Sequence, residues 1–158
     1  MKYITAVLFS SVLAVSSYGQ EFSKLSFQEF EPYLHRTTDS VYVINFWATW
    51  CAPCVKEVPH FNKAFQHFKD KPVAFYMVSL DFGPNVQSRL AAFKTKRNML
   101  TPIVLLDDPD SNSWIDKVSP NWSGALPATL IYRRENASFY EQTFSYTQLK
   151  QAIELKLK

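Results

Sequence analysis

The segment VYVINFWATWCAPC, residues 41–54, joins an apolar run to two cysteines that lie three positions apart. Its first half, Val41–Trp47, is rich in β-branched and aromatic residues, which is typical of a central strand buried on both faces. Its second half carries Cys51 and Cys54 and leads into a stretch with helical periodicity. The segment therefore predicts a buried strand that passes directly into a helix, with both cysteines at the junction.

The chain on either side of this junction alternates between strand and helix patterns. Apolar residues recur at helical spacing from the cysteines to about Phe68, and Pro59 within that helix predicts a kink. Further strands are expected over residues 73–80, 101–106, 128–132 and 138–144. Further helices are expected after the capping boxes at Ser26 and Ser145, after Val86, and over residues 114–118. This order predicts an α/β fold whose central mixed sheet is flanked by helices.

The size and composition of the chain suit one globular domain. It has 158 residues, of which 47% are hydrophobic and 20% are charged, so it can bury a substantial core. Its formal net charge of +3 is too small to indicate a nucleic-acid surface. Three glycines are too few to favour a Gly-rich phosphate-binding loop. We expect a monomer that binds no nucleic acid.

Residues 1–19 have the composition of a secretory signal peptide. Lys2 is followed by an apolar stretch from Ile4 to Val15 and then by small residues up to Gly19, which is the order typical of such leaders. We place the cut after Gly19, which leaves residues 20–158 as the domain. The alternative is an uncleaved N-terminal membrane anchor, for which the stretch is short and interrupted by serines. We therefore predict export to the periplasm or cell envelope of a bacterium, in soluble form.

The cysteine pair requires a chemical explanation. A bond between Cys51 and Cys54 would close almost no loop, so it would restrict the unfolded chain very little. A thiolate is the form of cysteine that attacks a disulfide, and the unpaired amides at a helix N-terminus favour the thiolate. Cys51 is therefore the predicted attacking residue, and Cys54, one turn deeper, is the predicted resolving residue. Pro53 suits the first turn, where its missing amide costs nothing.

Half of a zinc site is the alternative interpretation of the pair. Structural zinc takes four ligands, and the only other soft donors are His35, His60 and His67. The sequence holds no second pair of cysteines to complete such a site. We therefore expect no metal and no cofactor other than a redox-active disulfide between Cys51 and Cys54.

The WCxPC motif at a strand-to-helix junction resembles the thioredoxin superfamily. The stretch NFWATWCAPC, residues 45–54, with Glu57 and Pro59 after it, is similar to the exported branch of that superfamily, the thiol–disulfide interchange proteins related to TlpA and ResA. The stretch GALPAT, residues 124–129, resembles the second signature of the family, a loop that carries a cis proline before a strand. The resemblance covers nearly all of residues 20–158 and implies a thioredoxin-like fold.

The resemblance assigns roles to individual residues. Cys51 and Cys54 match the redox pair of the family. Pro127 matches the cis proline that packs against the disulfide, and the backbone of Leu126 would then form hydrogen bonds with a bound substrate segment. An ordinary trans proline in a turn is the alternative for Pro127, because most X–Pro bonds are trans. Trp50, directly before the pair, is expected at the rim of the site.

Glu57 matches a carboxylate that this branch keeps near the cysteines, where it would move protons during resolution. Helix geometry alone allows a solvated surface residue equally well. Ordinary thioredoxins hold a buried acid six residues before the first cysteine, and Asn45 takes that place here. Because asparagine does not titrate, Glu57 is the candidate proton acceptor. The long spacer before Pro127 fits an extra strand and helix, around residues 101–118, that the TlpA-like branch carries.

The resemblance implies a protein-disulfide oxidoreductase that acts as a reductant of cysteines in exported proteins, such as apocytochromes awaiting haem. Its partners would be protein thiols and disulfides, together with a membrane protein that resupplies electrons. One alternative is a thioredoxin-like module that holds client peptides without redox turnover. Another is a peroxidase on the same fold, but the lone reactive cysteine in a Thr-containing loop that such enzymes usually carry is absent.

Overall fold

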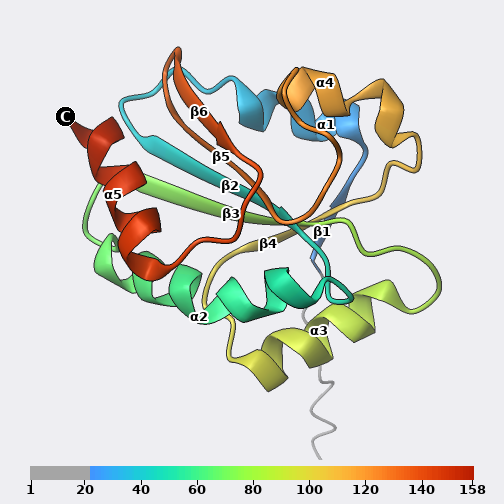
Figure 1. The fold of residues 1–158 in the computed structure, drawn as a ribbon. Coiled ribbons are helices and arrows are strands. Elements are labelled where there is room, and N and C mark those ends of the chain that lie inside the picture. Colours follow the sequence, from blue (N-terminus) through green and yellow to red (C-terminus); the bar gives the residue numbers. More distant parts are fainter. Residues whose placement is uncertain (1–21) are drawn as a thin grey trace, which may run out of the picture.

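The computed structural model describes residues 22–158, so the expected signal peptide, residues 1–19, lies outside the described residues. The described chain forms a central sheet with helices on both faces (Figure 1). Its elements in chain order are β1 (Ser23–Leu25), α1 (Phe27–Phe30), η1 (Glu31–Leu34), β2 (Val41–Trp47), α2 (Ala52–His67), β3 (Val73–Ser79), α3 (Val86–Arg97), β4 (Ile103–Leu106), η2 (Ser111–Ser113), α4 (Ile115–Val118), β5 (Ala128–Arg133), β6 (Asn136–Tyr140) and α5 (Tyr146–Leu157).

The six strands follow the order β1-β4-β3-β2-β5-β6 across the sheet. The strands β1, β4, β3 and β2 pair in parallel, whereas β5 is antiparallel to β2 and β6 is antiparallel to β5. The closing hairpin thus makes the sheet mixed, which confirms the expected α/β architecture. The strand that leads to the cysteines, β2, lies between β3 and β5, and all seven of its residues are buried.

Alternate residues of β2 point into two separate cores. Val43 and Trp47 pack on the side that α2, α3 and α5 cover, while Ile44 and Phe46 pack on the side of α1, η1 and α4. Figure 1 shows the same division of the helices between the two faces of the sheet. Because β2 is covered on both faces, it carries the near-continuous apolar run that its sequence shows.

Several boundaries differ from the sequence-based expectation. The strand β1 was not expected, because three residues are too few for a periodic pattern, and it is held by pairing with β4. The strand expected over residues 138–144 instead spans Asn136–Tyr140, so it begins two residues earlier and ends four residues earlier than predicted. Arg134, in the turn between β5 and β6, has a left-handed φ of 53°, a conformation that an arginine does not signal in sequence.

Both predicted capping boxes are present. Ser26 and Ser145 each accept a hydrogen bond from the backbone three residues later, and the side chain at that position accepts one in return. The helix α2 continues through Pro59 to His67, so this proline does not end it. Between residues 22 and 158, none of the helices combines the length and the apolar character needed to cross a bilayer.

Candidate active site

Cys51 and Cys54 form a disulfide at the N-terminus of α2, with their Cα atoms 5.3 Å apart. Cys51 is the N-cap residue, and its Sγ accepts a hydrogen bond of 3.3 Å from the backbone amide of Cys54. Pro53 occupies the first turn of the helix, as predicted. The free amides and the positive end of the helix dipole therefore face the sulfur of Cys51, which favours its thiolate when the bond is reduced.

The two cysteines differ in depth in the predicted order, although both are buried in the disulfide form. Cys51 is 7% exposed and Cys54 is 1% exposed. Trp50, directly before them, is 62% exposed and forms the predicted rim. Cys51 is therefore the more accessible of the two cysteines, and it lies directly after the exposed Trp50.

Asp81 holds the loop that precedes the cysteines. Its carboxylate accepts hydrogen bonds from the amide of Thr49 (2.9 Å), the hydroxyl of Thr49 (2.5 Å) and the hydroxyl of Ser79 (2.8 Å). Asp81 is the second residue after the end of β3 and is itself buried. No motif in the sequence singled out this residue. An acidic residue at the carboxyl end of the strand beside β2 was the available signal, because ligand sites gather at such ends.

Glu57 is completely buried, which decides against the solvated alternative. Its Oε1 accepts a hydrogen bond from Nδ2 of Asn45, and its Oε2 accepts one from the amide of Phe144, both at 2.9 Å. Burial raises the pKa of Glu57 to about 7, and these two hydrogen bonds only partly oppose the shift. Glu57 lies three residues after Cys54 in α2, so the two buried side chains share one face of the helix.

Asn45 connects Glu57 to β5, the strand that follows the cis proline. Its Nδ2 also donates a 3.0 Å hydrogen bond to the hydroxyl of Thr129, which lies opposite Asn45 in the β2–β5 pairing. Thr129 and Phe144 were not singled out from the sequence. Thr129 lies 84 residues from Asn45 in the sequence, and Phe144 lies 87 residues from Glu57. Hydrogen bonds between residues so far apart have no local sequence pattern.

The peptide bond between Leu126 and Pro127 is cis, as the resemblance implied. Pro127 is buried and Leu126 is half-buried. The loop before them is held by Trp122, whose indole Nε1 donates a 2.9 Å hydrogen bond to the carbonyl of Ala125. The contact between Pro127 and the disulfide stays a prediction.

A cavity of about 460 Å³ opens beside the disulfide. Its lining includes Trp50, Cys51 and Leu126, so the structure brings together the predicted attacking cysteine, the predicted rim residue and the residue predicted to pair with a substrate backbone. Trp114 and Trp122 form apolar parts of the same wall. Glu57 and Pro127 are not part of this lining, which is consistent with their burial behind it.

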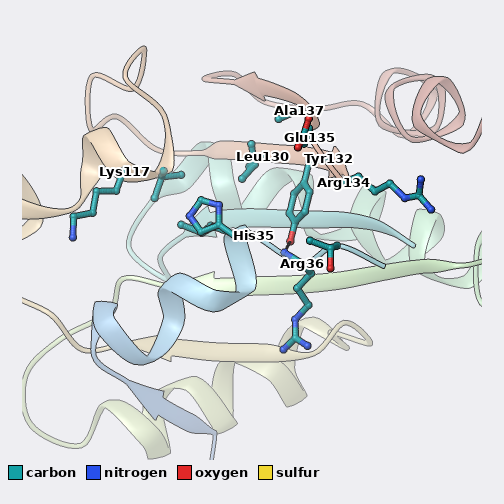
Figure 2. A pocket seen from close by; sticks show the side chains of 11 residues that line it. His35, Arg36, Lys117, Leu130, Tyr132, Arg134, Glu135 and Ala137 are labelled. Carbon is teal, nitrogen blue, oxygen red and sulfur yellow. Dashed lines mark hydrogen bonds between the residues drawn. The ribbon is translucent and has the colours of Figure 1, made fainter. Parts of the chain in front are cut away.

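A larger cavity, of about 700 Å³, lies near the start of β2 and away from the cysteines (Figure 2). Tyr132 and Leu130 form its apolar wall, and Arg36, Lys117 and Arg134 stand around it. In Figure 2 these three cationic side chains extend away from one another rather than toward a common point. The arrangement therefore offers no converging charges for a ligand. In the part of the chain from residue 22 onward, no group of histidine, cysteine and carboxylate side chains is placed to hold a metal ion.

Comparison of the sequence with curated proteins finds thiol–disulfide oxidoreductases. "Thiol-disulfide oxidoreductase ResA" of Bacillus subtilis is 33% identical over 94 residues, which are 58% of this chain and 46% of that protein. ResA of Oceanobacillus iheyensis is 46% identical over 39 residues, which are 25% of this chain and 20% of that protein. The chain thus matches less than half of the length of these two relatives.

Solved structures and a family model agree with the described fold. The thioredoxin-related protein from Neisseria meningitidis serogroup B superimposes with a TM-score of 0.65 at 25% identity, over 75% of this chain and 86% of that one. StoA from Bacillus subtilis, at 20% identity and a TM-score of 0.59 over 73% and 84% of the two chains, shares the fold. The AhpC/TSA family model matches residues 17–137, from before β1 into the closing hairpin. Because this match contains the whole junction that carries the cysteines, the chain belongs to the AhpC/TSA family and has the fold of thioredoxin-like disulfide oxidoreductases.

Proposed function

We propose that the protein is a thiol–disulfide oxidoreductase that reduces disulfides of exported proteins through Cys51 and Cys54. The observation that carries this proposal is the disulfide at the N-terminus of α2, with Cys51 in the wall of a cavity and Cys54 buried behind it. The names of the matching curated proteins support the same activity.

The reaction moves two electrons from the cysteine pair to the client. The thiolate of Cys51 attacks one sulfur of the client disulfide, forms a mixed disulfide and releases the other client sulfur as a thiolate. The thiolate of Cys54 then attacks the sulfur of Cys51. This second step forms the Cys51–Cys54 disulfide and releases the second client thiol, so the client is reduced and the protein is oxidised.

Glu57 is the proton acceptor for the second step. Cys54 must lose its proton before it attacks, and a buried carboxylate with a pKa of about 7 exchanges protons readily near neutral pH. Asn45 suits both states of this carboxylate. Its Nδ2 donates to Glu57, while its buried Oδ1 has no hydrogen-bond partner in the described part of the chain. A half-turn of the amide would present Oδ1 to protonated Glu57.

Trp50, Leu126 and Pro127 form the contact surface for the client. Trp50 and Leu126 line the cavity that contains Cys51, which supports a place for the client backbone between them. In this proposal the backbone of Leu126 pairs with the client segment, and Pro127 keeps that backbone next to the sulfur.

The cellular setting follows from the leader and the resemblance. The protein acts outside the cytoplasm, in the periplasm or cell envelope, and a membrane protein returns electrons to the Cys51–Cys54 disulfide. Apocytochromes c awaiting haem are one class of client that this setting supplies. A reduction potential as oxidising as that of DsbA-type proteins, measured by titration against glutathione, would contradict the direction proposed here.

The activity is tested with insulin as the protein disulfide and dithiothreitol as the electron source. We expect the full chain to accelerate the reduction and Cys51→Ser to lower the catalysed rate by about three orders of magnitude. Cys54→Ser, reduced beforehand and separated from dithiothreitol, should accumulate a mixed disulfide with insulin that gel electrophoresis resolves. Ser113→Ala, in an exposed short helix, is the control and keeps full activity.

Two results would contradict the proposal. If alkylation finds both thiols inert in the reduced native protein, no exchange chemistry is possible. If Cys51→Ser retains full biological activity, the protein is a client-binding module instead. Turnover of hydrogen peroxide in place of insulin would indicate the peroxidase.

A further inference from the structure

We propose that a groove running from Cys51 past Leu80 to Phe82 binds the client polypeptide and selects segments in which the cysteine has a large apolar neighbour and a basic residue beyond it. This client groove is defined by Trp50, Cys51, Leu80, Phe82, Asp108 and Trp114. The inference rests on the proposed function, because it specifies the substrate class of the same site.

Two adjoining cavities make up the client groove. The first, of about 460 Å³, contains Cys51, and the second, of about 410 Å³, contains Phe82. Leu80, Ser111 and Trp114 line both, so the two cavities share a wall. The two cavities are therefore neighbours, and in this proposal a polypeptide that presents a disulfide to Cys51 crosses their shared wall at Leu80 toward Phe82.

Two aromatic side chains are exposed along this path. Phe82 is 71% exposed and Trp50 is 62% exposed. The described chain exposes only two other large hydrophobic side chains, Leu100 and Leu155, and neither lines the groove. Exposed apolar side chains that gather beside a cavity mark a binding surface. An apolar client side chain placed between Phe82 and Leu80 would remove both from water.

The two loops that carry these aromatic residues are held in place before a client arrives. Asp81, next to Phe82, binds the amide and hydroxyl of Thr49, next to Trp50. Arg89 holds the other side of the second loop, because its guanidinium donates 2.7 Å and 3.1 Å hydrogen bonds to the carbonyls of Phe82 and Pro84. A surface ordered in advance loses less conformational entropy on binding, so it gains affinity.

The negative charge at the far end of the client groove indicates that the client carries a basic residue there. The charged side chains in the two linings are Asp107 and Asp108, and no cation is among them. Asp107 is paired with Lys24 at 2.7 Å. Asp108 accepts hydrogen bonds only from the amides of Phe27 and Asp110 in the described chain, so its carboxylate has no cationic partner there. A basic client residue complements this carboxylate.

Three synthetic peptides test the inference. Each carries one cysteine as a mixed disulfide with glutathione, and its neighbours are the same on both sides so that chain direction does not matter. The first has leucine and then lysine outward from the cysteine, the second serine and then lysine, and the third leucine and then glutamate. The second-order rate constant for oxidation of the reduced protein by each peptide is measured in a single turnover. The full chain is compared with Phe82→Ala, Asp108→Asn and the control Leu100→Ala, and glutathione disulfide serves as a small reference substrate.

We expect the protein to reduce the leucine–lysine peptide about tenfold faster than the serine–lysine peptide, since burial of one apolar side chain has an effect of this order. Phe82→Ala should remove most of that preference and leave glutathione disulfide unaffected. Asp108→Asn should reduce the preference for lysine over glutamate about threefold. Leu100→Ala should change nothing. Because Phe82 is mostly exposed, its variant keeps the fold, which an unchanged urea midpoint verifies.

The failures are distinguishable. If the wild-type protein reduces glutathione disulfide but treats the three peptides alike, the groove proposal is wrong and the proposed function stands. If Phe82→Ala slows glutathione disulfide as much as the leucine peptides, Phe82 supports the redox pair rather than the client, and the groove proposal is again wrong. If the wild-type protein reduces no disulfide at all, the proposed function itself fails.

Discussion

Two very different cavities lie near the two ends of the central strand β2. At its carboxyl end the cavity beside Cys51 holds about 460 Å³, and at its amino end the cavity beside Tyr132 holds about 700 Å³. The smaller one combines a helix N-terminus, a disulfide and loops held by Asp81. In this protein the volume of a cavity is a poor guide to the candidate active site. The carboxyl ends of strands and the N-terminus of a helix are a better guide.

The buried ionisable groups at the two ends of β2 also differ in whether they can exchange a proton near neutral pH. At the amino end the hydroxyl of Tyr132 donates to the carbonyl of Tyr33 and accepts from the amide of Arg36, so it closes a loop onto the sheet. Burial raises the pKa of Tyr132, which keeps the group neutral in this structural role. At the carboxyl end, Glu57 has its pKa raised into the neutral range, where it can exchange a proton.

The substitution expected to have the largest effect is Asp81→Ala, which removes the residue that holds the loop at the carboxyl end of β2. The change leaves the amide and hydroxyl of Thr49 and the hydroxyl of Ser79 without their acceptor, so we expect a loss of about 3 kcal/mol in the free energy of unfolding. Urea denaturation of the oxidised protein measures it. The control Asp116→Ala removes an exposed carboxylate and should change the value by less than about 0.5 kcal/mol. Equal losses in the two variants would show that Asp81 does not hold the site.

A smaller, pH-dependent effect is expected from Glu57→Gln. The pKa of Glu57 is about 7 in the folded protein and near its usual 4.5 in the unfolded chain. The folded state therefore holds the proton more tightly, so the free energy of unfolding falls as pH rises between these values. The fall due to Glu57 amounts to about 2 kcal/mol between about pH 5 and pH 7.5.

Glu57→Gln should remove this slope, which urea titrations of the oxidised wild-type and variant proteins at the two pH values compare directly. The variant should also slow the resolution step and remove its pH dependence near pH 7. Identical slopes in both proteins would mean that Glu57 does not titrate in this range. A normal resolution rate in the variant would assign the proton to another acceptor.

The smallest effect is expected at the amino end, from Arg134→Ala. Arg134 pairs with Asp39 at 2.6 Å, and both side chains are more than half exposed, so the pair contributes at most about 0.5 kcal/mol. Insulin reduction should be unchanged. A marked fall in that rate would show that the larger cavity takes part in the reaction, and the contrast between the two ends would no longer hold.

How far the sequence predicts this structure depends on the range of the interactions involved. The buried strand, the helix that begins at the cysteines and both capping boxes depend on periodicity and on contacts within four residues, which a sequence displays directly. The strand β1 and the left-handed Arg134 have no such local signal. The first depends on an edge provided by β4, and the second on the geometry of a two-residue turn.

The sequence by itself determined the position of the reactive sulfur, because the motif and the start of the helix are local properties of residues 45–54. Only the tertiary structure decided what surrounds that sulfur. Asp81 reaches Thr49, and Asn45 and Phe144 reach Glu57, because β3 and β5 flank β2 and because the chain before α5 folds back over α2. Such contacts arise from strand order and packing, so the burial and hydrogen bonds of Glu57 and the proposed client groove become visible only in the folded molecule.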